Sequence, residues 1–206
     1  MAANSNAVRS ATEITIYTPD HAGLFSKLAG AIAVSGGSIV DAKAFTTTDG
    51  FALDVFWVQN AEGQAFGDPS RIVRLRQTIE KTLTGEISPK RLLAQRNARK
   101  KRIAAFKIAP RVGFDNEAST SSTVVEVEGL DRQGFLYDVT QALFESGLSI
   151  SSSIVATYGE RAIDVFYVRD GFGHKITHPE RLKSIENRLL AVLNEDTLEG
   201  REPLRA

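Results

Sequence analysis

Apolar and polar residues change their spacing several times along the first part of the chain. Residues 12–18, which begin TEITIY, alternate apolar and polar side chains, and this predicts a strand with one buried face. From Leu24 the apolar positions recur three and four residues apart, which predicts a helix with one buried face. Gly36 and Gly37 follow that stripe and predict the end of the helix, because glycine readily adopts a left-handed backbone.

A hairpin and a second helix come next. The runs 38–48 and 51–59 are rich in strand-forming residues and are joined by Asp49-Gly50, a strong hairpin signal. Pro69 predicts the first turn of a helix, with Asp68 before it as the N-cap. A closing strand is predicted at 104–114, after a basic helical connector.

The same order of elements returns in the second half of the chain. Asp20 and Gly23 recur as Asp131 and Gly134, and after the hairpin Asp54 recurs as Asp164, which shortens the offset between the copies by one. One residue has therefore been lost at a turn, where a deletion is best tolerated. The pattern predicts an α+β protein with two ferredoxin-like βαββαβ modules, each an antiparallel sheet with helices on one face.

Module boundaries follow from these elements. Residues 1–11 are small and polar and are interpreted as a disordered leader or linker. The first module then covers 12–114, including the connector 86–103 and the closing strand 104–114. The second covers 115–206 and ends in a polar tail, which offers no fourth strand. Either its sheet is short, or 104–114 serves across the module boundary.

Composition narrows the class of protein. The 25 basic and 25 acidic residues cancel, which argues against a polyanion as the main partner. Cysteine is absent, which excludes disulfides, thiol nucleophiles and cysteine-based zinc sites. Apolar runs are shorter than the ~20 residues of a membrane helix. We therefore expect a cytoplasmic protein that binds neither nucleic acid nor membrane.

The two glycine-containing loops are the candidate sites. The loop at residues 20–23 places an acidic side chain and free backbone N–H groups at a helix N-terminus, which favours a carboxylate or phosphate ligand. Gly23 would let a ligand approach closely, since it has no Cβ. The alternative is that Asp20 only caps its own helix and Gly23 only relieves strain.

Several motifs resemble those of a known family. They are IVDAK, TTTDG, ALDVFWVQ, APRV, DNEAS and ATYGERAIDVFYVRD, spread over residues 12–193. The chain resembles tandem ACT domains, regulatory modules that commonly bind amino acids. More closely, it is similar to the C-terminal region of the bacterial bifunctional enzymes that uridylylate the nitrogen regulatory protein PII and remove the uridylyl group.

This resemblance implies a ligand and partners. The ligand would be glutamine, bound where a loop meets a neighbouring ACT unit, and ACT–ACT pairing and a homodimer are the two arrangements considered for the modules. Catalysis on PII, with its magnesium, would belong to a part upstream of residue 1, and no cofactor is expected here. The matched positions are Asp20, His21, Gly23, Leu24 and Phe25, then Asp131, Arg132, Gly134, Phe135 and Leu136, with Asp41 as a second candidate for the α-ammonium. Ala22 and Gln133 replace the proline usual in the family.

Other candidates have plainer interpretations. Asp54 and Asp164 interrupt apolar strands and are interpreted as lying on the open sheet face or pairing with a neighbouring strand, with a ligand or signalling role as the alternative. The basic run 90–102 is interpreted as a solvated connector, and the pair His174 and His178 lacks a third metal ligand nearby. No catalytic motif is present. A sensor of another amino acid, free-standing or in another enzyme, and a protein- or RNA-binding adaptor remain alternatives.

Overall fold

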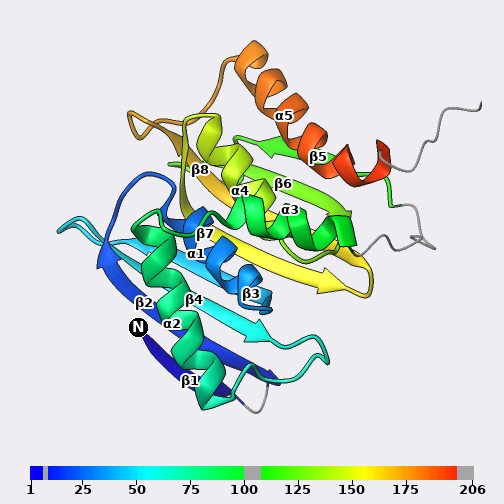
Figure 1. Ribbon diagram of the computed structural model, residues 1–206. Helices are drawn as coiled ribbons and strands as arrows, with labels where there is room; N and C mark the ends of the chain where they lie inside the picture. Colours follow the sequence, from blue (N-terminus) through cyan, green and yellow to red (C-terminus); the bar gives the residue numbers. More distant parts are fainter. Residues whose placement is uncertain (7–8, 100–107, 199–206) are drawn as a thin grey trace, which may run out of the picture.

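The computed structural model describes residues 1–6, 9–99 and 108–198 and contains two modules with the same order of elements, ββαββα (Figure 1). The first comprises β1 (Ala2–Asn6), β2 (Ala11–Pro19), α1 (Leu24–Val34), β3 (Ser38–Thr46), β4 (Phe51–Gln59) and α2 (Pro69–Leu83), followed by α3 (Pro89–Arg99). The second comprises β5 (Arg111–Asp115), β6 (Thr123–Leu130), α4 (Phe135–Glu145), β7 (Leu148–Tyr158), β8 (Arg161–Asp170) and α5 (Pro179–Leu198).

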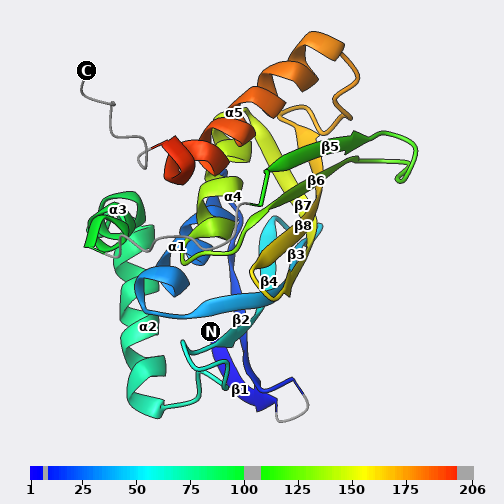
Figure 2. The same ribbon diagram turned by 90° about the vertical axis from the view of Figure 1, so that its right-hand side faces the viewer.

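Each module has one antiparallel sheet of four strands, in the orders β1-β2-β4-β3 and β5-β6-β8-β7. Figure 2 shows α1, α2 and α4 on the same side of the two sheets. This is the predicted α+β fold of two antiparallel sheets with helices, but the fourth strand of each sheet precedes its βαββα unit, so the predicted order βαββαβ is wrong. Gly50 has a φ of 81° in the hairpin, and Asp68 accepts a hydrogen bond from the backbone N–H of Ser70 at the start of α2, so both local predictions are confirmed.

The outer strand of each sheet comes from the N-terminal side of its module, which corrects the predicted boundaries. Residues 2–6 form β1 beside β2, so they are not a disordered leader. Arg111–Asp115 pairs with β6, so the predicted strand at 104–114 closes the second sheet, the alternative that the polar tail had left open. Its residues 104–107 lie outside the described residues. An edge strand is held mainly by main-chain hydrogen bonds on one side, so a polar sequence such as AANSN forms one without any periodic pattern.

The modules meet along β3 and β7, which lie next to each other, and through α1, which packs against α4 (Figure 1). The hydroxyl of Ser153 in β7 donates to the carbonyl oxygen of Ala42 in β3, at 3.3 Å. One continuous hydrophobic core includes buried residues of both modules. Because of this side-by-side packing, the loop that precedes the first helix of each module faces the other module.

The connector after the first module is helical, as predicted, but it is not solvated all round. In α3, Leu93 is buried against Ala33, Val34 and Tyr137, while Lys90 and Arg91 are exposed. Lys90 and Arg91 therefore face solvent, and the side of the helix that carries Leu93 lies between the modules. Along residues 1–6, 9–99 and 108–198, no helix is long and apolar enough to cross a membrane.

Candidate functional site

A cavity of about 560 Å³ lies between the modules at the second loop, residues 131–134. This second-loop cavity has a volume typical of small-molecule sites, ~300–1,000 Å³. The second module lines it with the loop, the first turn of α4 and strands β7 and β8. The first module contributes the C-terminal half of α1 and the turn into β3. The lining residues are Ala29, Ala33, Gly36, Gly37, Ser38, Ile39, Ala61, Asp131, Arg132, Gln133, Gly134, Phe135, Leu136, Tyr137, Val155, Thr157, Ala162 and Asp164.

Gly134 sets the geometry at the start of α4. It is the N-cap residue with a φ of 89°, a conformation that favours glycine, and no side chain caps the helix. The backbone N–H of Phe135 donates to the carbonyl oxygen of Arg132 at 3.0 Å. The next N–H groups, of Leu136 and Tyr137, belong to the first turn, where no intrahelical acceptor exists. The helix therefore presents backbone donors and a positive dipole end beside the cavity.

Asp164 places a buried carboxyl group in the same cavity. It is 1% exposed, and neither carboxylate oxygen makes a hydrogen bond of normal geometry. Burial raises the pKa of Asp164 to about 8; the nearby charge of Asp131 adds to the shift, and the backbone N–H of Ala156 opposes it. Asp164 pairs with Val127 of β6 and with Val155 of β7, as one part of its interpretation has it, but the other part, that it lies on the open sheet face, is wrong. It lies on the helix-covered face, as does Asp54, which is 3% exposed and whose pKa burial raises to about 7.

Asp131 is the second acid of the cavity. Burial raises its pKa, and the charge of Glu160 acts in the same direction, while a hydrogen bond from the backbone of Arg132 and the charge of that side chain lower it. Two carboxyl groups that are desolvated together repel each other when both are ionised, and a cation placed between them relieves both effects. The cavity therefore offers acids for a cationic group and helix N–H groups for an anionic one.

Loop residues predicted in the second copy are all brought together here. Asp131, Arg132, Gly134, Phe135 and Leu136 line the cavity. The guanidinium of Arg132 lies 2.5 Å from the carboxylate of Asp138 and also donates to the carbonyl oxygen of Val192 at 3.4 Å, so it ties the loop to α4 and α5. Phe135 and Leu136 are mostly buried.

The predicted residues of the first copy have different surroundings. Asp20 accepts a hydrogen bond from the hydroxyl of Thr46, His21 is exposed, and Gly23 is the N-cap of α1 with a φ of 77°. Leu24 and Phe25 are buried in the core, and Asp41 forms an ion pair with Arg9. No side chain caps α1, so the alternative in which Asp20 caps its own helix is wrong. None of these residues lines the second-loop cavity.

The first-module side of the cavity was not predicted. Ala29, Ala33 and the turn at residues 36–39 line it, as do Tyr137 and Thr157 of the second module. Only one sequence signal bears on them, the resemblance that places a ligand between a loop and a neighbouring unit. Which helix end the loop would meet depends on the packing of α1 against α4, and no local pattern encodes that packing.

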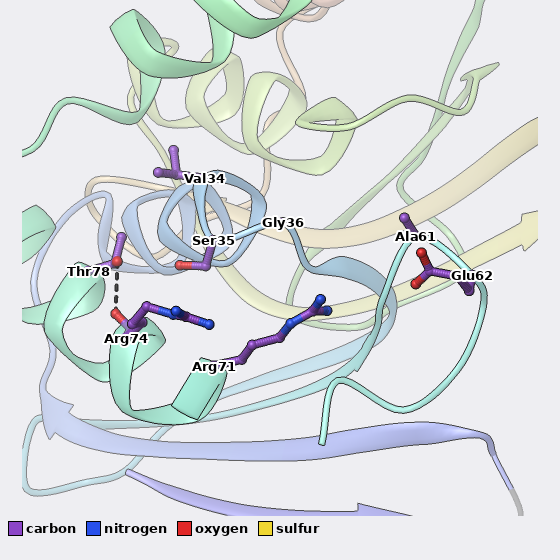
Figure 3. Close-up of a pocket in the computed structure, with 8 residues that line it drawn as sticks. All are labelled: Val34, Ser35, Gly36, Ala61, Glu62, Arg71, Arg74 and Thr78. Atoms are coloured by element: carbon purple, nitrogen blue, oxygen red, sulfur yellow. Dashed lines mark hydrogen bonds between the residues drawn. The ribbon is translucent and has the colours of Figure 1, made fainter. Parts of the chain in front are cut away.

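A second cavity of about 530 Å³ adjoins the first, since Gly36 and Ala61 line both. Figure 3 shows Arg71 and Arg74 of α2 on one side and Glu62 on the other. The two arginines lie close to the C-terminal end of α1, where a cation is favoured by the helix dipole. All three charged residues are exposed, so this hollow is interpreted as surface charge at a helix end.

Metal ligands are not gathered anywhere in the described part of the chain. Within residues 1–6, 9–99 and 108–198 no group of three or more His, Cys, Asp or Glu side chains could hold a metal ion. In the loop before α5, the backbone N–H of His174 donates to the carboxylate of Asp170 at 2.9 Å.

Comparison with known proteins identifies the second module. Residues 118–195 match the family model of the ACR family N-terminal ACT domain. The chain is 52% identical over 187 residues to a bifunctional uridylyltransferase/uridylyl-removing enzyme of Azospirillum brasilense, and 49% identical over 187 residues to that of Gluconobacter oxydans strain 621H. The second module is an ACT domain. Each alignment covers 90% of this chain and 20% of the enzyme, so the chain is homologous to about a fifth of those proteins.

One solved structure shows a looser likeness. The crystal structure of aspartate kinase from Synechocystis aligns with 93% of this chain and 27% of that chain, at a TM-score of 0.41 and 13% identity.

Proposed function

We propose that this chain senses an amino acid, glutamine, and thereby controls a catalytic part that lies outside it. That part would uridylylate PII at low glutamine and remove the uridylyl group at high glutamine, as the relatives' names support for the two activities. The observation that carries the proposal is Asp164, a buried carboxyl group whose oxygens make no hydrogen bond of normal geometry, in a cavity that also contains a helix N-terminus. A ligand that carries both a cationic and an anionic group could place the cation against the Asp164 carboxyl group and the anion at the helix N-terminus.

An α-amino acid has this arrangement of charges. Its ammonium group would lie against Asp164 and Asp131, which would then ionise together because the cation offsets their repulsion. Its carboxylate would accept hydrogen bonds from the first-turn N–H groups of α4. Ser38 and Thr157, polar side chains from the two modules, remain for the side-chain amide of glutamine.

Because the ligand would contact both modules, its binding would favour the arrangement in which they are closed on each other. A catalytic part that prefers one arrangement would respond by the difference in its affinity, typically ~1–3 kcal/mol of coupling. We also propose that the chain acts in the cytoplasm, since it contains no cysteine, and that magnesium acts with the catalytic part only.

A thermal-shift and calorimetry screen of the 20 amino acids tests the proposal. Glutamine should raise the melting temperature and bind with a measurable heat, and glutamate, which adds a negative charge near Asp131, should bind more weakly. Asp164→Asn should abolish binding. Asp54→Asn is the matched control, because it removes a buried carboxyl group at the equivalent strand position outside the cavity.

Two results would overturn the proposal. The chain would not be an amino-acid sensor if none of the 20 amino acids changed its melting temperature or gave a binding heat. The cavity would not be the site if Asp164→Asn bound glutamine as the unmodified chain does. If a different amino acid bound instead, the cavity would still be the proposed site, but its ligand would not be glutamine.

A further inference from the structure

The first loop, residues 20–23, has the same relation to the second module as the second loop has to the first. At the first loop, Gly23 contacts Phe144 near the end of α4. At the second loop, the side-chain amide of Gln133 donates to the carbonyl oxygen of Ala33 near the end of α1, at 2.7 Å. Ala33 and Phe144 occupy equivalent positions in the two copies of the repeat. Each loop therefore lies at the end of the facing helix, and the equivalent residue there is Phe144 at the first loop and Ala33 at the second.

Phe144, which is 37% exposed, lies against the first loop. Three of its ring atoms lie 3.3 Å from the point where a Cβ on Gly23 would be, so the ring rests on the loop glycine. Ala33, by contrast, lines the second-loop cavity. A second difference acts in the same direction, because Leu148, which is 5% exposed, replaces Gly37, another lining residue. Phe144 and Leu148 are thus larger than Ala33 and Gly37, the equivalent residues that line the second-loop cavity.

The helix α3 also contacts the second loop, but it does not fill the cavity there. Leu93 of α3 contacts Gly134, with its Cδ1 atom 3.1 Å from where a Cβ on that glycine would be. Leu93 is nevertheless not among the residues that line the cavity, so it covers the loop from outside and leaves the volume open. Neither of the two cavities described above contains a residue of the first loop.

The acids differ as well. Asp20, the equivalent of Asp131, accepts a hydrogen bond from Thr46. Thr157, which is equivalent to Thr46, instead lines the cavity. The carboxyl group of Asp20 is thus hydrogen-bonded within its own module, whereas the equivalent pair, Asp131 and Thr157, lines the cavity.

We propose that this chain binds one amino acid, at the second loop, and that Phe144 keeps the equivalent site at the first loop closed. This inference rests on the proposed function for the nature of the ligand. To that function it adds the number of amino acids bound per chain and the residue, Phe144, that limits this number to one.

Titration calorimetry with glutamine tests the inference through the number of ligands per chain. The unmodified chain should bind one. Phe144→Ala removes the ring from Gly23 and should raise the number to two, the added site being the weaker because Leu148 remains. Phe45→Ala is the matched control, since Phe45 is a half-exposed phenylalanine on the open face of β3, and this variant should still bind one.

An exchange of the two side chains gives a sharper test. Ala33→Phe should fill the second-loop cavity and abolish binding. The double variant with Ala33→Phe and Phe144→Ala should bind one glutamine again, at the first loop. Asp54→Asn, and not Asp164→Asn, should then abolish that binding. Circular dichroism spectra would verify that each variant is folded.

The outcomes separate the two proposals. Two glutamines bound by the unmodified chain, or one bound by a folded Phe144→Ala variant, would overturn the inference and leave the sensor intact. Full binding by a folded Ala33→Phe variant would also overturn it. An unmodified chain that binds no amino acid would overturn the proposed function and the inference together.

Discussion

At the scale of single residues, Asp164 makes the stability of this chain depend on pH. Burial raises the pKa of its carboxyl group from 3.8 to about 8 in the folded chain. Between these values the folded chain holds a proton that the unfolded chain releases, so the free energy of unfolding falls as the pH rises from about 4 to 8. The charge of Asp131 faces this group and adds to the shift, and the N–H of Ala156 opposes it.

Asp164→Asn should remove this contribution, because asparagine stays neutral at every pH. We expect the variant to melt at least ~2 °C above the unmodified chain at pH 8, the shift that ~1 kcal/mol causes in a chain of 150–250 residues, and to melt at about the same temperature at pH 4. Melting curves of both proteins at several pH values would check this. A constant difference across the whole range would contradict the raised pKa. Burial raises the pKa of Asp54 to about 7, so Asp54 adds a smaller pH dependence of stability that is the same in the unmodified chain and in Asp164→Asn.

Residues also show where sequence reasoning reached its limit. Asp131 and Gly134 of the second loop could be predicted as candidates, because an acid and a glycine at a helix start fit a ligand loop. Ala33 and Phe144 could not, since alanine and phenylalanine at an apolar helix position indicate only that the position is covered. Their effect depends on which loop the helix end meets, and that is settled by contacts between the two modules, which lie far apart in the sequence.

At the scale of elements, Gly30 fixes how closely three helices approach. It lies in α1, and a Cβ there would be 2.7 Å from Pro89, the first residue of α3, and 2.7 Å from the ring of Tyr137 in α4. Gly30→Ala would raise the helix propensity of α1 by ~1 kcal/mol, but neither ring can move aside without repacking. We expect a net loss of ~1–3 kcal/mol in the free energy of unfolding.

Urea unfolding of Gly30→Ala and Gly113→Ala together would measure this. Gly113 lies in β5, where an added Cβ meets nothing within 4 Å, so its substitution should leave stability unchanged or slightly higher. Equal midpoints for the two variants would show that α1, α3 and α4 are not packed as described.

Elements with a strong apolar period could be predicted from the sequence, and the edge strands could not. The strands β2, β3 and β4 and the helices α1 and α2 lie close to their predicted bounds, because burial of one face dictates their pattern. The strand β1 has the sequence AANSN, and its place depends on the free edge of β2. A strand held by backbone hydrogen bonds to an edge leaves little trace in side-chain spacing.

At the scale of the whole molecule, the two modules form one unit. A single hydrophobic core contains residues of both, β3 lies beside β7, and the cavity takes its lining from both modules. Two sandwiches with separate cores would unfold independently and a ligand would stabilise only one of them. A shared core and a shared cavity instead couple them, as the proposed sensor requires if binding in the cavity is to act on both modules.

Differential scanning calorimetry should therefore record one transition for residues 1–206, with equal calorimetric and van't Hoff enthalpies. Glutamine at 100 times its dissociation constant should stabilise the fold by ~2.7 kcal/mol and move the entire transition up by roughly 5–11 °C. Asp164→Asn should melt in one transition that glutamine does not move, since its fold is kept and its site is lost. If the unmodified chain instead showed two transitions, with only one shifted by glutamine, the modules would be independent. The ligand would then be held by the second module alone, and the contacts from α1 would contribute nothing to binding.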